Sequence, residues 1–291
     1  MQWIINDEVA HMTVNDFLRK KQSFSRRILT AIKYDGGSIV VNGAEVRTTY
    51  KLQVADCLRV TFPKESRGPM LTPEKGPLNI VYEDDYVLVI NKPAHLATIP
   101  SAIHPRNTLA NRIIHYYNEN DIHSTIHVVT RLDRDTSGLV LIAKNRYIHS
   151  LLSQHMHKKS IRRKYYALVE GNLEQQAGEI NARIDRKQGS IIEREVTDRG
   201  KAALTVYRVL KEGPRYSLLD VELKTGRTHQ IRVHFSHINH PLLGDDLYGG
   251  TTQVMMRQAL HCYYLSFNHP TTNEYIELTT SLPEDMQEII L

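Results

Sequence analysis

From residue 164 to residue 278 the sequence is a series of short β-rich runs. Turn residues separate these runs, and few helical segments lie between them. The clearest of these runs are residues 164–170, 205–210, 216–223, 230–235, 260–267 and 275–278. Strands that follow one another this closely favour a mostly antiparallel sheet. The sequence therefore predicts an α+β fold, with residues 230–235 as one of the strands.

Residues 129–143, VTRLDRDTSGLVLIA, place a charged segment directly before a turn and an apolar run. The aliphatic residues 139–142 follow Ser137-Gly138, and an apolar run after such a breaker is typical of a buried strand. The charged residues before the turn would then form a loop at the end of a sheet, a common place for reactive groups. They are Arg131, Asp133, Arg134 and Asp135. On these residues alone, a salt-bridged surface loop is an equally good interpretation.

Composition restricts the class of protein. The chain has 291 residues, which at roughly 150 residues per domain is enough for about two domains. No stretch approaches the roughly 20 apolar residues of a membrane helix, and the first residues lack the pattern of a signal peptide. Cys57 and Cys262 lie too far apart to suggest a disulfide framework or a zinc cage. We therefore expect a cytoplasmic protein with no membrane partner.

Basic residues are concentrated in two runs. The net charge is +5, so the placement of the charge is more informative than its size. Residues 17–34 contain six basic residues and no acidic one, and residues 158–164, KKSIRRK, form the second run. A single basic run is more often a solvated face, but two of them favour a polyanionic partner, nucleic acid above all.

The first 62 residues predict a small α+β unit. Residues 14–33 have apolar side chains close to helical spacing, interrupted at Gln22-Ser23, and Ser25 is suited to cap a second helix. Strands are expected over residues 38–41, near Val46 and over residues 57–62, with a turn at Asn42-Gly43. Residues 63–77 follow with four prolines and mixed charge, which predicts an extended linker.

This order of helix, turn, helix and hairpin resembles the S-four-type RNA-binding module. The matching segments are FLRKKQSFSRRIL, GGSIVVNGAEV and DCLRVTF, with one departure at Ala55, where that module usually has glycine. The resemblance implies an S-four-like RNA-binding module over residues 1–62, the linker over 63–77 and a second domain over 78–291.

Three motifs follow one another in the second domain. They are RLDRDTSG at residues 131–138, RKYYA at 163–167, and TGRTHQIRVH at 225–234 followed by HPLLGD at 240–245. Together they resemble the RluA-type RNA pseudouridine synthases, such as those that act on the large ribosomal subunit. NKPA at 91–94 and LHCYYLSFNHP at 260–270 extend the resemblance, which covers about residue 81 to the C-terminus. It implies a pseudouridine synthase catalytic domain, and hence an isomerase that converts specific uridines of structured RNA to pseudouridine.

The resemblance assigns roles to individual residues. The catalytic aspartate falls on Asp133, whereas spacing alone does not choose between Asp133 and Asp135. The active-site tyrosine falls on Tyr165, so Tyr166 would point to the opposite face of its strand. The arginine that pairs with the catalytic carboxylate falls on Arg232.

The RNA-binding residues follow from the same motifs and from the first basic run. The predicted set is Arg131, Arg227 and His229 in the second domain and Lys20, Lys21, Arg26 and Arg27 in the first. Thr130 stands where many members of the family have histidine, which leaves open any role of that histidine in substrate contact. Arg163 stands where lysine is common and keeps the positive charge.

These residue types suit the implied reaction. Pseudouridylation breaks the bond between a uracil nitrogen and ribose and rejoins the base through carbon 5, so neither a redox change nor a donated group requires a cofactor. The carboxylate must be ionised, as aspartate, with a reference pKa of about 3.9, is at neutral pH; a neighbouring arginine would compensate its burial. The uracil must leave its stack, at a cost of a few kcal/mol, and an aromatic side chain returns roughly 1–3 kcal/mol per stacked base. The hydroxyl of Tyr165 could also assist removal of the carbon-5 proton.

Other interpretations remain open on the sequence alone. The fifteen histidines lack convergent carboxylates or cysteines at ligand spacing, so no metal is expected. We expect a monomer whose partner is RNA, with large-subunit ribosomal RNA as the first candidate and transfer RNA as the second. A non-catalytic RNA-binding or ribosome-assembly factor would tolerate loss of Asp133. A hydrolase such as a nuclease or glycosidase would need a second positioned carboxylate.

Overall fold

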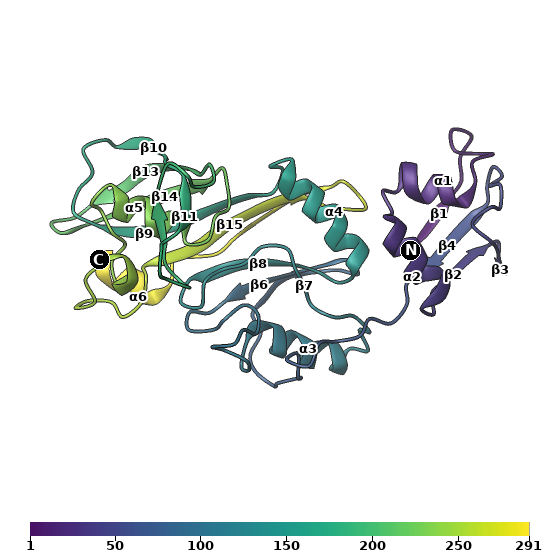
Figure 1. Ribbon diagram of the computed structural model, residues 1–291, viewed down its shortest axis with the longest axis horizontal. Helices are drawn as coiled ribbons and strands as arrows, with labels where there is room; N and C mark the ends of the chain where they lie inside the picture. Colours follow the sequence, from purple (N-terminus) through teal and green to yellow (C-terminus); the bar gives the residue numbers. More distant parts are fainter. Residues whose placement is uncertain (291) are drawn as a thin grey trace.

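The computed structural model describes residues 1–290, which form two β-sheets and a separate two-stranded hairpin. Figure 1 shows the smaller sheet and its helices at one end of the long axis of the molecule. The larger sheet occupies the remainder, and α5 (Gln230–His237) and α6 (Glu284–Ile290) lie at the other end. No helix within residues 1–290 combines the length and apolar composition needed to cross a membrane.

The smaller sheet belongs to the N-terminal residues and is antiparallel, in the order β1-β4-β2-β3. Its strands are β1 (Gln2–Ile4), β2 (Ser38–Val41), β3 (Ala44–Glu45) and β4 (Cys57–Thr61). Its helices are α1 (Val14–Asp16), the π-helix η1 (Phe17–Lys21) and α2 (Arg26–Tyr34). Ser25 caps α2 as predicted, since its hydroxyl accepts a hydrogen bond from the Ile28 N–H at 3.2 Å.

The larger sheet has ten strands, and its main path runs β10-β13-β14-β9-β15-β8-β6-β5. Strand β16 (Tyr275–Thr279) pairs with β15, and β7 (His127–Val128) pairs with β8. The path strands are β5 (Ile80–Glu83), β6 (Val87–Lys92), β8 (Ser137–Ala143), β9 (Arg162–Glu170), β10 (Ala177–Asn181), β13 (Leu204–Glu212), β14 (Tyr216–Leu223) and β15 (Leu260–Asn268). Only β8 and β15 pair in parallel. The predicted α+β fold with a mostly antiparallel sheet is confirmed.

The remaining elements flank this sheet. They are α3 (Leu109–Glu119), α4 (Arg146–His157), the hairpin strands β11 (Ile184–Arg186) and β12 (Arg194–Val196), and the 3-10 helix η2 (Asp246–Tyr248). The side chains of Thr108 and Asn145 cap α3 and α4 by accepting backbone N–H bonds three residues further on.

One predicted strand is wrong. Residues 230–235 form the first six residues of the helix α5, not a strand. All six are buried, so the segment shows no alternation between a polar and an apolar helix face. It is also entered through His229 in the left-handed region, with φ 56°, and no side chain caps its start. Arg232 and His234 therefore project from a helix.

Strand β8 is central because both of its faces are covered, and all seven of its residues are buried. Gly138 permits its parallel contact with β15: its φ is +115°, and a Cβ atom there would lie 2.3 Å from the Cys262 carbonyl oxygen. The loop before β8 is thus anchored at a crowded strand start.

Residues 63–77 contain no helix or strand, yet they are fastened to the larger unit. The Glu65 carboxylate accepts hydrogen bonds from the Ser124 hydroxyl and the Thr125 N–H, and lies 2.6 Å from Nε2 of His127. The Arg67 guanidinium donates to backbone carbonyls of Ser124 and Ile122.

An aromatic cluster joins the two units next to this segment. Phe24 of the N-terminal unit lies 4.1 Å from the Tyr147 ring of α4, centroid to centroid, and Phe62 stacks on the same tyrosine. The Tyr147 hydroxyl donates to the Gln22 carbonyl at 2.7 Å. The division of the chain into domains at residues 62 and 78 stays a prediction.

Candidate active site

The loop that precedes β8 is held by backbone hydrogen bonds on both sides of Asp133. The Thr98 hydroxyl donates to the Leu132 carbonyl at 2.7 Å, and the Thr136 N–H donates to the Asp133 carbonyl at 3.2 Å. Thr130 is buried, and its hydroxyl accepts a hydrogen bond from the Leu141 N–H at 2.9 Å. The threonine at this position therefore closes the loop against β8.

Lys92 supports the same loop from the end of β6. Its ammonium is fully buried and donates to the carbonyls of Pro93, Leu96 and Arg134 at 2.8–3.0 Å. Burial lowers the pKa of Lys92 to about 7, against the attraction of Asp135 and Asp133. A side chain from the sequence NKPA thus ties the loop backbone to the sheet.

Arg232 lies between two carboxylates. Its Nε and Nη2 donate to the two oxygens of Asp245 at 2.7 and 2.8 Å, and its Nη1 donates to Oδ2 of Asp133 at 3.0 Å. The Asp245 side chain is fully buried, whereas 30% of the Asp133 side chain is exposed. Asp133 is therefore the accessible end of a buried ion-pair chain.

The two carboxylates stabilise the charged form of Arg232. Burial disfavours that form, but the hydrogen bonds and charge of Asp245, followed by those of Asp133, outweigh burial and raise the Arg232 pKa. Asp245 is the buried partner of the guanidinium, and Asp133 is the accessible one.

His229 and Tyr248 complete the surroundings of this chain. The Tyr248 ring lies under the Arg232 guanidinium, 4.9 Å from Cζ to the ring centroid, and its hydroxyl lies 2.8 Å from Nδ1 of His229. Nε2 of His229 lies 3.7 Å from Oδ2 of Asp133. Burial lowers the His229 pKa, with the attraction of Asp133 acting against it, so the imidazole is neutral at neutral pH.

Tyr165 and Tyr166 project from opposite faces of β9. Tyr165 is 3% exposed and lies in the wall of a cavity beside Asp133. Burial, more than any other cause, raises the Tyr165 pKa well above its usual value, so the hydroxyl is protonated at neutral pH. Tyr166 instead stacks on Tyr263, with ring centroids 3.9 Å apart.

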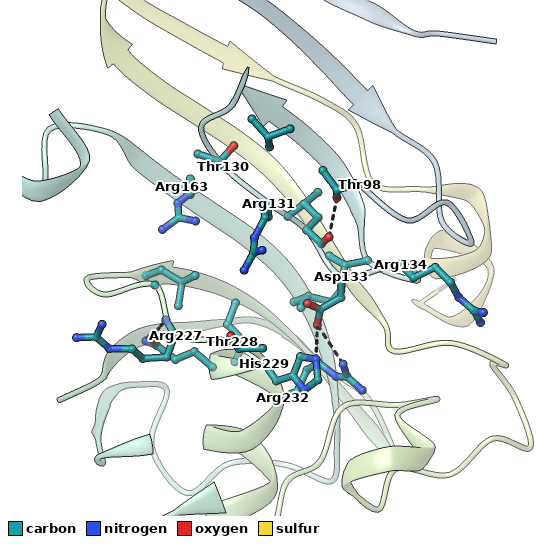
Figure 2. Close-up of a pocket in the computed structure, with 18 of the residues that line it drawn as sticks. Thr98, Thr130, Arg131, Asp133, Arg134, Arg163, Arg227, Thr228, His229 and Arg232 are labelled. Atoms are coloured by element: carbon teal, nitrogen blue, oxygen red, sulfur yellow. Dashed lines mark hydrogen bonds and ion pairs between the residues drawn. The ribbon is translucent and has the colours of Figure 1, made fainter. Parts of the chain in front are cut away.

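The cavity has a volume of about 600 Å³, which falls in the range of ~300–1,000 Å³ typical of ligand sites. Asp133 is the only carboxylate among the residues within 1–290 that line it. The other predicted residues that line it are Arg131, Tyr165, Arg227, His229 and Arg232. Figure 2 shows Asp133 facing His229 and Arg232, with Arg131 and Arg227 further along the wall.

The predicted residues of the N-terminal unit lie outside this cavity. Lys20 and Lys21 on η1 and Arg26 and Arg27 on α2 are all exposed. Lys20 pairs with Asp16 at 3.3 Å, four residues earlier. The structure therefore separates the predicted RNA-binding residues into two groups, one in the cavity and one on the small unit.

Asp135, the alternative to Asp133, does not line the cavity. Its carboxylate lies 2.9 Å from Nδ1 of His95 and accepts a hydrogen bond from Nε of Arg134 at 3.0 Å. Burial would raise the Asp135 pKa, but Arg134 and then His95 outweigh it and lower the pKa. These contacts fit a structural acid.

Two residues of this arrangement have no predicted role. Asp245 ends the motif HPLLGD, and a carboxylate at the end of a recognisable motif is a signal of a functional residue. The sequence does not show, however, that this carboxylate faces Arg232. Tyr248 follows in DDLYGG without any distinguishing pattern. His234, from the same motif as Arg232, is buried, and its two ring nitrogens lie 2.9 Å from the Thr205 hydroxyl and the Ala182 carbonyl oxygen.

No group of three or more His, Cys, Asp or Glu side chains within residues 1–290 is arranged to hold a metal ion. Cys57 and Cys262 are both free. The expectations of no metal and no cofactor stay predictions.

Comparison with known proteins agrees with the motifs. The family model described as RNA pseudouridylate synthase matches residues 86–237. The chain is 46% identical to a Bacillus subtilis (strain 168) protein named uncharacterized RNA pseudouridine synthase YjbO, over 96% of this chain and 98% of that protein. It is 40% identical to the ribosomal large subunit pseudouridine synthase D of Yersinia pestis, over 87% and 82% of the two chains. The solved structure of human RNA pseudouridylate synthase domain containing 1 superimposes with a TM-score of 0.59 at 27% identity, covering 72% of this chain and 86% of that one.

Proposed function

Because this chain belongs to the RNA pseudouridylate synthase family, and is thus an isomerase that converts uridine to pseudouridine in RNA, we propose that Asp133 is its single catalytic carboxylate. The observation that carries the proposal is the ion-pair chain from Asp245 through Arg232 to Asp133. It presents one partly exposed carboxylate to a cavity that has no other among residues 1–290.

The isomerisation of uridine requires a reactive group such as this carboxylate. The bond between N1 of uracil and C1′ of ribose breaks, a bond between C5 and C1′ forms, C5 loses its proton and N1 gains one. In these bond changes Asp133 attacks the ribose or the base, or accepts a proton from the nucleotide. Arg232 keeps the carboxylate oriented for these steps and stabilises its negative charge before it reacts.

The target uridine enters the cavity by leaving its stack, in this proposal, and Tyr165 receives the base. Flipping costs a few kcal/mol, and stacking on an aromatic ring returns roughly 1–3 kcal/mol. Because the raised pKa keeps the Tyr165 hydroxyl protonated at neutral pH, this residue does not act as a phenolate base. Its proposed role is to stack on the base through its aromatic ring. Arg131, Arg227 and His229 contact the RNA around the displaced nucleotide.

The proposed target is large-subunit ribosomal RNA. Support comes from relatives named ribosomal large subunit pseudouridine synthase D, at 34–40% identity. Residues 1–62 act as an S-four-like RNA-binding module through Lys20, Lys21, Arg26 and Arg27, and residues 63–77 link it to the catalytic domain over 78–291. We also propose that the protein acts in the cytoplasm and as a monomer.

Tritium release from RNA labelled at carbon 5 of uridine tests the proposal. The wild-type protein should release label from a large-subunit ribosomal RNA transcript and not from transfer RNA transcripts. Asp133→Asn should bind the same RNA with unchanged affinity and release no label. Release near the wild-type rate by Asp133→Asn would contradict the assignment and direct attention to Asp135, while release only from transfer RNA would contradict the target.

A further inference from the structure

Arg163 has a buried guanidinium without a partner. It is only 9% exposed, and within residues 1–290 its side chain makes neither a hydrogen bond nor an ion pair. Its Nε is shielded from solvent and has no acceptor. The two other largely buried arginines differ, since Arg232 is paired with Asp133 and Asp245 and Arg257 with Asp285.

A largely buried guanidinium without a carboxylate partner is unfavourable, because no opposite charge compensates its burial. Proteins retain such groups where a ligand supplies the missing partner. Arginine stays protonated at every accessible pH and offers only donors, and its strongest hydrogen bonds are those to an anionic acceptor. Arg163 is therefore suited to bind an anion.

The position of Arg163 restricts that anion to the cavity. Arg163 and Tyr165 project from the same face of β9 and both line the cavity. Gly226 brings the loop after β14 against the guanidinium, and a Cβ atom at Gly226 would lie 3.0 Å from its Nη2. In Figure 2 Arg163, Arg131 and Arg227 lie on one side of the cavity, and Asp133, His229 and Arg232 lie on the other.

We propose that Arg163 binds a phosphate of the RNA backbone next to the target uridine, and so contributes to the affinity for the substrate RNA. The assignment rests on the proposed entry of uridine into this cavity. Phosphodiesters are the only groups of RNA that are anionic at neutral pH, and the guanidinium fork fits phosphate oxygens with two parallel hydrogen bonds. The neighbouring Arg131 and Arg227, with no carboxylate on that side, complement the same charge.

The alternative partner is the uracil base itself, whose oxygens gain negative charge once the bond to ribose is broken. The two partners predict different effects. A phosphate is charged before and during the reaction, so its contact strengthens binding of the substrate. A base that becomes anionic only during the reaction would make Arg163 affect kcat and leave RNA affinity unchanged.

The test uses the full chain and a large-subunit ribosomal RNA transcript labelled at carbon 5 of uridine. Arg163→Gln, Arg163→Lys and the control Arg162→Gln are compared for RNA affinity over a series of KCl concentrations, for kcat and KM, and for thermal unfolding without RNA. Arg162 is the adjacent residue on the same strand, exposed and paired with Glu222 at 3.1 Å. Losing one phosphate contact should make the slope of log Kd against log salt smaller by about 0.7–0.9.

We expect Arg163→Gln to weaken RNA binding and raise KM about tenfold, with that change of slope and with kcat largely kept. Arg163→Lys should retain the slope, because the ammonium still meets the phosphate. Without RNA, Arg163→Gln should melt at or above the wild-type temperature, since it removes an unpaired buried charge. A lower melting temperature with unchanged salt dependence would show a structural role instead, and a loss confined to kcat would show contact with the base. Either result overturns the proposal.

The two proposals fail in different ways. If the wild-type protein binds the transcript but releases no tritium, the proposed target is wrong, whereas the salt dependence of binding still decides the phosphate contact. If tritium is released normally and Arg163→Gln matches Arg162→Gln in affinity and slope, Arg163 has no phosphate partner and the proposed function stands.

Discussion

Asp245 holds Arg232 with both of its carboxylate oxygens, at 2.7 and 2.8 Å, and leaves Nη1 as the donor that reaches Asp133. A guanidinium bound along one edge in this way cannot rotate without breaking two charge-assisted hydrogen bonds. The position of Asp133, the proposed catalytic residue, thus depends on an acidic residue that is fully buried.

Replacing Asp245 should disturb both stability and catalysis. Asp245→Asn leaves Arg232 with a buried charge that only Asp133 compensates, so we expect a loss of about 3 kcal/mol in the free energy of unfolding. Misplacement of Asp133 should lower kcat about 100-fold. Urea unfolding and tritium release measure the two effects, and the neighbouring exposed residue gives the control Asp246→Asn. Equal stability and activity in the two variants would mean that Asp245 does not position Arg232.

Tyr165 should contribute through its ring. Tyr165→Leu removes the aromatic surface and should weaken RNA binding by roughly 1–3 kcal/mol, whereas Tyr165→Phe should keep the wild-type affinity. Tyr166→Leu is the control, because Tyr166 packs on Tyr263 outside the cavity. Filter binding of a ribosomal RNA transcript gives the dissociation constants. A loss of affinity in Tyr165→Phe as large as in Tyr165→Leu would assign the effect to the hydroxyl.

Glu65 should make stability depend on acid pH. Burial raises its pKa, but hydrogen bonds and charge from His127, Thr125 and Ser124 outweigh burial and lower the pKa from 4.5 to about 2. A lowered folded-state pKa gives stability that is fully present above pH 4.5 and is lost as the pH falls from 4.5 toward 2. Glu65→Gln should therefore cost about 2 kcal/mol at neutral pH.

The difference between wild type and Glu65→Gln should shrink across the same window when urea unfolding is repeated at decreasing pH. Glu119→Gln, an exposed carboxylate of α3, serves as the control and should show no such trend. A difference that persists unchanged at the acid end would exclude ionised Glu65 as the origin of the stability.

The exposed cations of the N-terminal unit should act on RNA affinity and leave the chemical step unchanged. Arg26→Gln with Arg27→Gln should raise the Kd for the ribosomal RNA transcript and lower the salt slope by about 0.7–0.9 per lost phosphate contact. At saturating RNA the rate of tritium release should equal that of the wild type. Lys211→Gln with Arg215→Gln, two exposed cations of the larger unit, is the control. Identical Kd values for the two double variants would remove the N-terminal unit from RNA binding.

Features that depend on neighbouring residues could be predicted from the sequence. Ser25 is predicted to cap a helix, and its hydroxyl accepts a hydrogen bond from the backbone N–H three residues further on. The apolar run after Ser137-Gly138 is a central buried strand. Helix caps and buried apolar runs depend on residues that are close together in the chain, so they can be predicted directly from the sequence.

Features that depend on tertiary packing could not. Residues 230–235 have a β-rich composition, and the helix that they form is buried on every side. Its sequence therefore shows neither the helical spacing of apolar residues nor a capping residue. The pairing of Arg232 with Asp133 joins residues 99 positions apart and followed only from the family resemblance. Asp245 meets Arg232 because α5 and the loop after it fold back on each other, a geometry that a predicted strand would not give.

The fastening of residues 63–77 has a consequence for substrate selection. Glu65 and Arg67 bond the larger unit, and Tyr147 packs on Phe24 and Phe62, so the connection does not behave as a flexible tether. A flexible tether would let the two units engage sites at many separations, with an effective concentration set by its length. In the proposed complex, a fixed connection admits only RNAs in which the segment bound by Arg26 and Arg27 and the uridine at Asp133 are one set distance apart. We therefore expect the three-dimensional shape of the RNA, in addition to its sequence near the uridine, to decide which position is modified.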